Sequence, residues 1–208
     1  MADKIRAGII GATGYTGAAM LEVLVRHPNV ELRFATTRQP DLAGKEVHLE
    51  HPNLLDLTDL KFTLYDPARS AFSQVNEAVL KQARDGDVTF ICVPSGASVS
   101  ISRDLVGYDT RLIDTSADFR LKDPARYKEF YGMDHALPEL LKEYVYGLPE
   151  LHRDEIRGAK YVACPGCNAT AMILAAYPLT KLDIFRDLRI AFDVMVGSSE
   201  AGAELTRG

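Results

Sequence analysis

Near its N-terminus the chain reads Ile5-Arg-Ala-Gly-Ile-Ile-Gly-Ala-Thr-Gly-Tyr-Thr-Gly17, which passes from an apolar, β-branched run into three glycines spaced three residues apart. Residues 18–26 follow with apolar side chains at helical spacing. Pro28 ends that helix, because the residue before a proline avoids helical backbone angles. The sequence therefore predicts a strand over residues 5–10, a glycine turn and a helix.

Strands and helices are expected to alternate along the rest of the chain. Further strands are predicted at residues 30–36, 61–65, 88–93, 111–114, 160–163 and 188–196, and further helices at residues 70–84, 97–106, 124–130 and 168–177. Such alternation is typical of βαβ units, whose strands form a parallel sheet. The predicted fold class is α/β, with a doubly wound (Rossmann) parallel sheet over residues 1–150 and a second, α+β domain over residues 151–208.

The glycine turn is a Gly-x-x-Gly-x-x-Gly relative of the dinucleotide fingerprint. Glycines permit a tight turn and let backbone amides approach a pyrophosphate, while the helix N-terminus adds partial positive charge. A strand before the turn and a helix after it are the context that this interpretation requires. We therefore expect nucleotide binding here, although the same glycines would also suit a strand–helix turn without a ligand.

The end of the second strand indicates which nucleotide would bind. An acidic residue there binds the ribose hydroxyl of NAD, whereas an arginine accommodates the 2′-phosphate of NADP. The strand ends in Thr36-Thr37-Arg38 without a carboxylate at its tip, since Glu31 lies at the opposite end. Thr37 and Arg38 are therefore expected to contact NADP; a solvated surface arginine is the alternative.

The apolar strand over residues 88–93 runs into Cys92-Val-Pro-Ser-Gly96. In sheets of this architecture the carboxyl ends of the strands face the ligand. Pro94, Ser95 and Gly96 are therefore candidates for lining the nicotinamide side. Cys92 lies inside the apolar run and is expected to be an inert core residue.

The turn Cys164-Pro-Gly-Cys167 allows three interpretations. The two cysteines could form a redox dithiol or half of a zinc site. Zinc would need two further ligands, and the five histidines form no ligand pair, so we expect no metal. Alternatively, Cys167 acts alone at the start of the helix over residues 168–177, whose N-terminus stabilises a thiolate nucleophile. A cysteine nucleophile beside a nicotinamide suits acyl transfer to sulfur followed by hydride transfer to the thioester.

Four motifs occur in an order typical of one family: Gly11-Ala-Thr-Gly-Tyr-Thr-Gly17, Asp114-Thr-Ser-Ala-Asp-Phe-Arg120, Tyr146-Gly-Leu-Pro-Glu150 and Pro165-Gly-Cys167. Together they resemble N-acetyl-γ-glutamyl-phosphate reductase, a relative of aspartate-semialdehyde dehydrogenase, and the resemblance runs through the whole chain. It implies NADPH-dependent reduction of an acyl phosphate to a semialdehyde, in arginine or lysine biosynthesis.

The resemblance also implies roles for individual residues. Cys167 matches the catalytic nucleophile, and Ser116 and Arg120 fall in the motif that faces the nicotinamide and the substrate. Arg120 has the fixed charge and forked donors that suit an acyl-phosphate oxygen; an ion pair with Asp118 or Asp123 is the structural alternative. The residues that match the nucleotide loop are Gly11, Thr13, Gly14, Tyr15, Thr16 and Gly17.

Two turns depart from the common arginine-pathway enzyme. That enzyme continues its cysteine motif with Tyr-Pro-Thr, whereas this chain has Asn168-Ala-Thr170, and a later turn reads Gly197-Ser-Ser-Glu-Ala-Gly-Ala203. Both variants look more like the branch whose substrate is attached to a small acidic amino-group carrier protein. The implied substrate is carrier-linked aminoadipyl or glutamyl phosphate, with Asn168 beside the reacting acyl group. The free N-acetylated substrate is the alternative.

Members of the family are longer than this chain, and their catalytic histidine follows the turn over residues 197–203. None of the five histidines matches that motif, so we expect the histidine to lie beyond Gly208 and the second, catalytic domain to be truncated. The family also implies a homo-oligomer formed through that domain. A nucleotide or redox sensor that kept the fold, with Cys164 and Cys167 as its switch, is the non-enzymatic alternative.

Composition bounds the class of protein. Hydrophobic residues make up 47% and charged residues 25%, as in an ordinary globular chain. The net charge of −5, without a basic stripe, argues against nucleic-acid binding. The apolar stretches are shorter than the ~20 residues of a membrane span, and the N-terminus lacks the apolar core of a signal peptide. Three cysteines make no disulfide framework, so we expect a cytoplasmic protein. From the charge and the short apolar stretches we expect no nucleic-acid or membrane partners.

Overall fold

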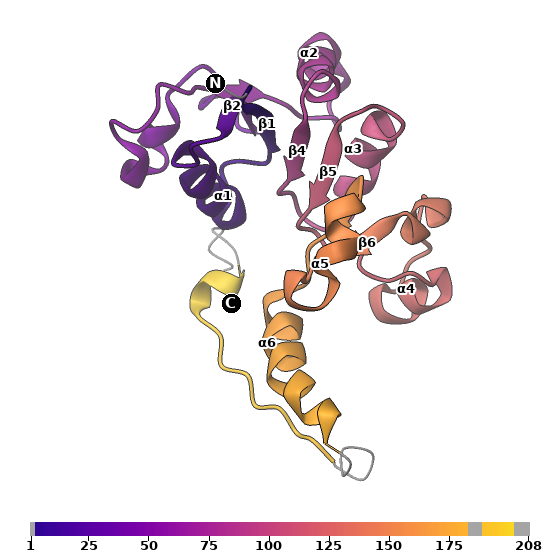
Figure 1. Cartoon of the computed structure of the whole chain (residues 1–208). Coiled ribbons are helices and arrows are strands. Elements are labelled where there is room, and N and C mark those ends of the chain that lie inside the picture. Colours follow the sequence, from indigo (N-terminus) through magenta and orange to yellow (C-terminus); the bar gives the residue numbers. More distant parts are fainter. Residues whose placement is uncertain (1–2, 183–188, 202–208) are drawn as a thin grey trace.

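The computed structural model describes residues 3–182 and 189–201. Within these residues, seven strands form one sheet in the order β3-β2-β1-β4-β5-β7-β6, and every neighbouring pair is parallel (Figure 1). The strands are β1 (Ile5–Ile10), β2 (Val30–Thr37), β3 (Phe62–Leu64), β4 (Val88–Ile91), β5 (Arg111–Asp114), β6 (Tyr144–Tyr146) and β7 (Tyr161–Ala163). The predicted parallel α/β sheet is confirmed.

Helices cover both faces of this sheet (Figure 1). They are α1 (Tyr15–Val25), α2 (Ser73–Arg84), α3 (Ser98–Leu105), α4 (Pro124–Tyr131), α5 (Pro149–Gly158) and α6 (Cys167–Ala176). Leu21 of α1 belongs to one apolar core, whereas Val79 of α2 and Ile101 of α3 belong to another. The neighbouring residues Ile9 and Ile10 of β1 divide between these two cores, because side chains alternate along a strand. The sheet is therefore doubly wound. Among the described residues, no helix is both long and apolar enough to span a membrane.

Most of the predicted elements are present with bounds shifted by a few residues. β5 covers residues 111–114 as predicted, and α1 begins at Tyr15, three residues before the predicted helix. The sequence does not predict β6 or α5. β6 has only three residues and lies at the edge of the sheet, and α5 begins at Pro149, a residue suited to the first turn of a helix.

The strand predicted over residues 188–196 is wrong for residues 189–196, and residue 188 lies outside the described part. Residues 189–197 have no regular secondary structure and lead into a short 3₁₀ turn, η7 (Ser198–Ala201). A strand requires a neighbouring backbone for its N–H and C=O groups. No strand in the described ranges pairs with this segment, so its apolar, β-branched composition is not sufficient.

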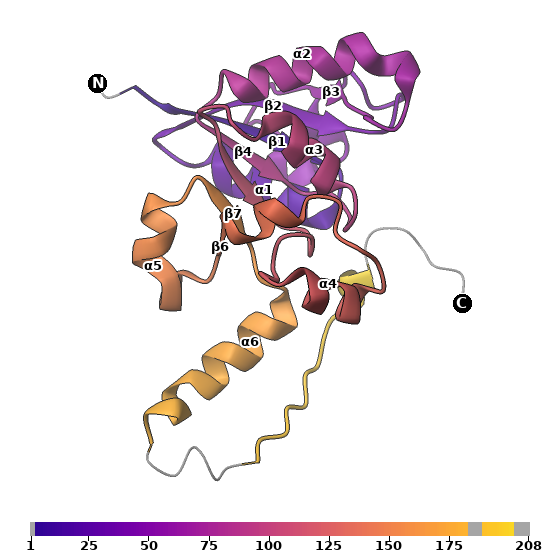
Figure 2. The same ribbon diagram turned by 90° about the vertical axis from the view of Figure 1, so that its right-hand side faces the viewer.

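Helix α6 leads away from the sheet, and the residues after 188 run back toward it (Figure 2). The helix follows β7 directly, and β7 pairs with β5 inside the seven-stranded sheet. The domain boundary expected between residues 150 and 151 remains a prediction, and β7 lies beyond it. The path of the chain places the start of α6 and η7 near the same edge of the sheet as α1 (Figures 1 and 2).

Candidate functional site

The turn between β1 and α1 is shaped by two glycines that have no room for a side chain. Gly11 has a φ of +90°, and a Cβ there would overlap the backbone carbonyl of Cys92, the residue that follows β4. A Cβ on Gly17 would overlap the carbonyl oxygen of Gly11. The Gly17 contact brings α1 directly onto the end of β1, which is the close approach that the glycine pattern predicts.

Hydrogen bonds from two neighbouring segments hold the same turn. The backbone N–H of Gly11 donates to Thr36 Oγ1 at 3.0 Å, and that of Ala12 donates to the Thr36 carbonyl at 2.8 Å. On the other side, Nε2 of the buried His51 lies 2.8 Å from the carbonyl oxygen of Ala12. The turn is therefore fixed by the end of β2 and by the loop that follows it.

The N-terminus of α1 is open to a ligand. Gly14 precedes the helix with extended backbone angles, and no side chain caps the first turn. A Cβ added at Gly14 would meet nothing within 4 Å, in contrast to Gly11 and Gly17. The first N–H groups of a helix lack partners within the helix and carry partial positive charge. This end of α1 can accept an anionic group such as a pyrophosphate.

At the end of β2, Thr37 and Arg38 have different environments. Thr37 is buried, and its Oγ1 accepts a hydrogen bond from the Gln39 N–H at 3.0 Å. Arg38 is exposed, and its Nε lies 3.6 Å from Oδ1 of the buried Asp66. Arg38 thus presents a positive charge at the strand end where an adenosine 2′-phosphate is expected.

The predicted nicotinamide loop after β4 is tied to the loop after β5. The N–H of Gly96 donates to both carboxylate oxygens of Asp118, at 2.7 and 2.8 Å. Ser95 Oγ accepts a hydrogen bond from the Ala117 N–H at 3.3 Å. These bonds fix the turn that includes Pro94. The contact of this turn with the nicotinamide stays a prediction.

Ser116 lies in a buried network beneath these loops. Its hydroxyl is 2.8 Å from Asp114 Oδ2 and 2.9 Å from Ser98 Oγ, and Ser98 also donates to Asp118 at 2.8 Å. Burial raises the pKa of Asp114, and the hydrogen bonds from Ser116 and Ser98 oppose that rise. The Ser116 hydroxyl holds the loop in place through these hydrogen bonds, and its contact with a cofactor stays a prediction.

Cys167 is the first residue of α6, one residue before the predicted start of this helix, and differs from the other two cysteines in its exposure. Its side chain is exposed, and Gly166 before it leaves the helix N-terminus without a side-chain cap. Burial raises the pKa of Cys164 to about 11 and that of Cys92 to about 12.

In the part of the chain that the structure describes, no three His, Cys, Asp or Glu side chains are grouped to hold a metal ion.

Arg120 connects the loop after β5 to the turn before Cys167. Its Nε donates to the Cys164 carbonyl at 2.7 Å, and its Nη2 donates to the Thr115 carbonyl at 2.9 Å. Neither Asp118 nor Asp123, both within the described residues, forms an ion pair with it. Two backbone carbonyls, rather than a carboxylate, therefore hold the guanidinium.

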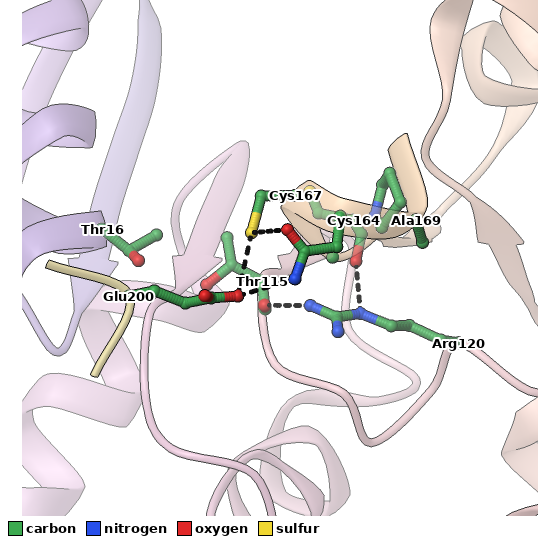
Figure 3. Close-up of a pocket in the computed structure, with 10 residues that line it drawn as sticks. Thr16, Thr115, Arg120, Cys164, Cys167, Ala169 and Glu200 are labelled. Atoms are coloured by element: carbon green, nitrogen blue, oxygen red, sulfur yellow. Dashed lines mark hydrogen bonds between the residues drawn. The ribbon is translucent and has the colours of Figure 1, made fainter. Parts of the chain in front are cut away.

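One pocket brings several of the predicted residues together (Figure 3). It has a volume of about 610 Å³. Its lining residues are Thr16, Thr115, Arg120, Cys164, Pro165, Gly166, Cys167, Asn168, Ala169 and Glu200. Thr16 of the glycine turn thus shares a cavity with Cys167, Asn168 and Arg120, whereas Arg38 and Gly96 do not line it. The pocket lies between the start of α1 and the start of α6 (Figure 3).

Glu200 is a pocket residue for which sequence analysis proposes no role. Its Oε1 accepts a hydrogen bond from Asn168 Nδ2 at 2.8 Å and lies 3.8 Å from Cys167 Sγ (Figure 3). Asn168 Oδ1 also lies 3.8 Å from that sulfur. The sequence does mark this residue indirectly, because Glu200 lies in the turn over residues 197–203 that departs from the common arginine-pathway enzyme. Residues 202–203 of that turn lie outside the described part.

Comparison with known sequences gives concordant matches. Residues 6–159 match the family described as semialdehyde dehydrogenase, NAD binding domain. The LysW-L-2-aminoadipate/LysW-L-glutamate phosphate reductase of Saccharolobus solfataricus is 42% identical over 208 residues, covering 100% of this chain and 55% of the relative. The N-acetyl-gamma-glutamyl-phosphate reductase of Nitrosococcus oceani is 41% identical over 204 residues, covering 98% of this chain and 55% of the relative. The chain spans about half the length of the curated relatives it matches.

Solved structures share the fold at low sequence identity. Aspartate semialdehyde dehydrogenase II of Vibrio cholerae, complexed with ASA, aligns with a TM-score of 0.56 and 17% identity, covering 86% of this chain and 43% of that one. Aspartate semialdehyde dehydrogenase of Candida albicans, solved with NADP, aligns with a TM-score of 0.53 and 15% identity, covering 86% and 47%. These likenesses support the doubly wound architecture.

Proposed function

Because the chain belongs to the semialdehyde dehydrogenase family through its NAD-binding domain, we propose that it carries the nucleotide site and the nucleophile of an NADPH-dependent reductase. The reaction converts an acyl phosphate to a semialdehyde in lysine or arginine biosynthesis. The observation that carries this proposal is the shared pocket of Thr16 and Cys167 (Figure 3). A nucleophilic sulfur and a nucleotide loop in one cavity are what transfer of a hydride to a thioester requires.

The described residues fit NADP. The uncapped first turn of α1, with open space at Gly14, suits the pyrophosphate. Arg38 at the end of β2 supplies a charge for the 2′-phosphate. The loop after β4 would face the nicotinamide. The proposed NADP-contacting residues are Gly11, Thr13, Gly14, Tyr15, Thr16, Gly17, Thr37, Arg38, Pro94, Ser95, Gly96 and Ser116.

Cys167 performs the covalent step. Its thiolate attacks the acyl carbon, the new S–C bond forms, and the C–O bond to phosphate breaks so that phosphate leaves. When bound, NADPH supplies the hydride that reduces the resulting thioester. The S–C bond then breaks, which releases the semialdehyde and returns Cys167 to the thiolate. The exposure of Cys167, in contrast to the half-buried Cys164 whose pKa is raised, supports this assignment.

Other pocket residues position the reacting group. The free N–H groups at the start of α6 can stabilise the oxyanion that develops on the acyl carbonyl oxygen when the thiolate attacks. Asn168, held by Glu200, lies beside the sulfur and is proposed to contact the substrate. Arg120 fixes the turn that carries Cys167, and its charge lies within reach of an acyl phosphate in the same cavity.

The proposed substrate is aminoadipyl or glutamyl phosphate attached to a small acidic carrier protein. The name of the Saccharolobus relative, with its LysW-linked substrates, supports this choice. Asn168 and Glu200, which contact each other beside Cys167, are the structural support because they stand where the sequence departs from the arginine-pathway enzyme. The Nitrosococcus relative, which is almost equally similar, favours N-acetyl-γ-glutamyl phosphate as the alternative.

We further propose a cytoplasmic homo-oligomer that binds the carrier protein and neither nucleic acid nor membranes. The proposed catalytic domain begins near residue 151. Three free cysteines support a reducing compartment. The raised pKa of Cys164 favours the single-nucleophile role of Cys167 over a redox switch that pairs the two thiols.

An acyl-enzyme trapping experiment tests the proposal. The protein is incubated with N-acetylglutamyl phosphate or the carrier-linked acyl phosphate, without NADPH, and its intact mass is measured. We expect a mass increase equal to the acyl group, which is discharged by NADPH and absent in Cys167→Ser. Cys164→Ser is the matched control and should still acylate. An adduct that survives Cys167→Ser, or one that NADPH does not discharge, would contradict the mechanism.

A further inference from the structure

Asp66 is a buried carboxylate that contacts two arginines from different segments. It lies two residues beyond β3, and its side chain is only 2% exposed. Oδ1 lies 3.6 Å from Arg38 Nε at the end of β2, and Oδ2 lies 3.3 Å from Arg69 Nε in the loop before α2. The sequence pattern at the end of β2 indicates Arg38 alone, so Arg69 is a new member of this cluster.

The backbone around Asp66 is held rigidly from α2. Asp66 N–H donates to Asn76 Oδ1 at 2.9 Å, and Asn76 Nδ2 donates back to the Asp66 carbonyl at 2.8 Å. Asp66 Oδ1 also accepts a hydrogen bond from the Ala68 N–H at 3.2 Å. Because Asn76 is itself buried, the carboxylate has a fixed position at which both arginines meet.

The charges in this cluster do not balance. Two guanidinium groups share one carboxylate, which leaves one positive charge in excess. Each arginine meets Asp66 through Nε, and no hydrogen bond to a described residue engages the terminal nitrogens of either fork. Arg38 and Arg69 are 63% and 60% exposed, so these ion pairs contribute little to stability. A pair of forked donors with unused nitrogens is suited to a dianionic phosphate.

The cluster also lies at the expected place for the adenosine ribose. β2 and β3 are parallel and pair Thr37 with Leu64, so their carboxyl ends reach the same edge of the sheet. In doubly wound sheets that edge binds the nucleotide, and the end of the second strand binds the adenosine ribose. Arg69 therefore faces the same ligand region as Arg38.

We propose that Arg69 is a second determinant of NADP specificity, which together with Arg38 binds the 2′-phosphate over the Asp66 carboxylate. The inference rests on the proposed NADPH-dependent function. It assigns cofactor selectivity to a pair of arginines from two loops rather than to the tip of β2 alone.

Calorimetric titration of the protein with adenosine 2′,5′-bisphosphate and with 5′-AMP tests this role directly, without an activity assay. The variant is Arg69→Met, because methionine keeps an apolar stem near Phe72, whose ring centre is 5.9 Å from the Arg69 guanidinium carbon. Arg38→Met is the comparison. Arg126→Met, at an exposed arginine on α4 paired with Glu129, is the matched control.

We expect Arg69→Met and Arg38→Met each to weaken bisphosphate binding by about tenfold or more and to leave 5′-AMP binding nearly unchanged. Arg126→Met should change neither affinity. Loss in Arg38→Met with wild-type affinity in Arg69→Met would overturn the role of Arg69 and leave the proposed NADPH preference intact. Equal affinity of the wild-type protein for both ligands would overturn that preference, and the role of Arg69 with it.

Discussion

Arg120 Nε donates a hydrogen bond of 2.7 Å to the backbone carbonyl of Cys164, three residues before the candidate nucleophile. The same guanidinium donates to the Thr115 carbonyl at 2.9 Å, so one side chain joins the loop after β5 to the turn before α6. A Cβ at Gly166 would lie 3.2 Å from Arg120 Nη1, which shows how closely the turn wraps around this group. The position of Cys167 therefore depends on Arg120.

Replacing Arg120 by methionine should destabilise the protein by about 2 kcal/mol, because two partly buried carbonyls lose their donors. Chemical denaturation followed by circular dichroism measures this change. Arg126→Met removes an exposed arginine of the same length on α4 and should shift stability by less than about 0.5 kcal/mol. Equal stability of the two variants would show that Arg120 does not hold the turn.

Two alanine substitutions in the glycine turn should separate a structural glycine from a ligand-binding one. Gly17→Ala places a Cβ against the Gly11 carbonyl and should cost about 1–3 kcal/mol of stability. Gly14→Ala adds a Cβ to open space at a φ of −78°, so its stability cost should stay below about 1 kcal/mol.

In contrast, Gly14→Ala should weaken NADPH binding by about tenfold, since its methyl group occupies the approach to the first turn of α1. Thermal unfolding and fluorescence titration with NADPH measure the two effects on the same samples. Unchanged NADPH affinity in Gly14→Ala would place the pyrophosphate elsewhere.

The elements that sequence analysis predicts well are those whose neighbours are close in sequence. The strand over residues 5–10 and the helix after it are encoded by an apolar run, three glycines and a helical apolar face. β6 could not be predicted from the sequence, because its three residues become a strand only by pairing with β7. The error at residues 189–196 has the same origin, since a strand-like composition does not provide a pairing partner.

Site residues that lie in one motif can be predicted from the sequence, whereas contacts between distant segments cannot. Cys167 at a helix N-terminus follows from the local sequence. Glu200 meets Asn168 across 32 residues, and Arg38 at the end of β2 meets Asp66 beyond β3. These pairs depend on the path of the chain between them, and no spacing in the sequence encodes it.

The three cysteines should differ in their rates of alkylation. Burial penalises the thiolate and raises the pKa of Cys164 to about 11, so at pH 8 only about one in a thousand of these thiols is ionised. Its alkylation by iodoacetamide should rise about tenfold per pH unit until the pH approaches 11. Cys92, with a pKa raised to about 12, should react more slowly still, whereas the exposed Cys167 is labelled first.

Peptide mass spectrometry after timed labelling between pH 7 and pH 10 measures these rates. Labelling in concentrated guanidinium chloride is the control, because unfolding removes the burial and should bring the three rates together. Labelling of Cys164 as fast as that of Cys167 in the folded protein would contradict the assigned difference and favour the dithiol interpretation.

The substrate itself gives the last test. Asn168 stands where the common arginine-pathway enzyme has a tyrosine, and its Nδ2 donates to Glu200 at 2.8 Å across the pocket. A small amide at this position leaves space beside Cys167 for an acyl group joined to a long, peptide-like arm. We therefore expect the protein to reduce carrier-linked aminoadipyl or glutamyl phosphate with a kcat/KM at least about tenfold above that for free N-acetylglutamyl phosphate.

The variant Asn168→Tyr fills the space beside Cys167 and loses the bond to Glu200, so it should lower kcat/KM for the carrier-linked substrate far more than for the free one. Steady-state assays of both substrates with both proteins measure the ratio, and a higher efficiency with the free N-acetylated substrate in the wild-type protein would return it to the arginine pathway.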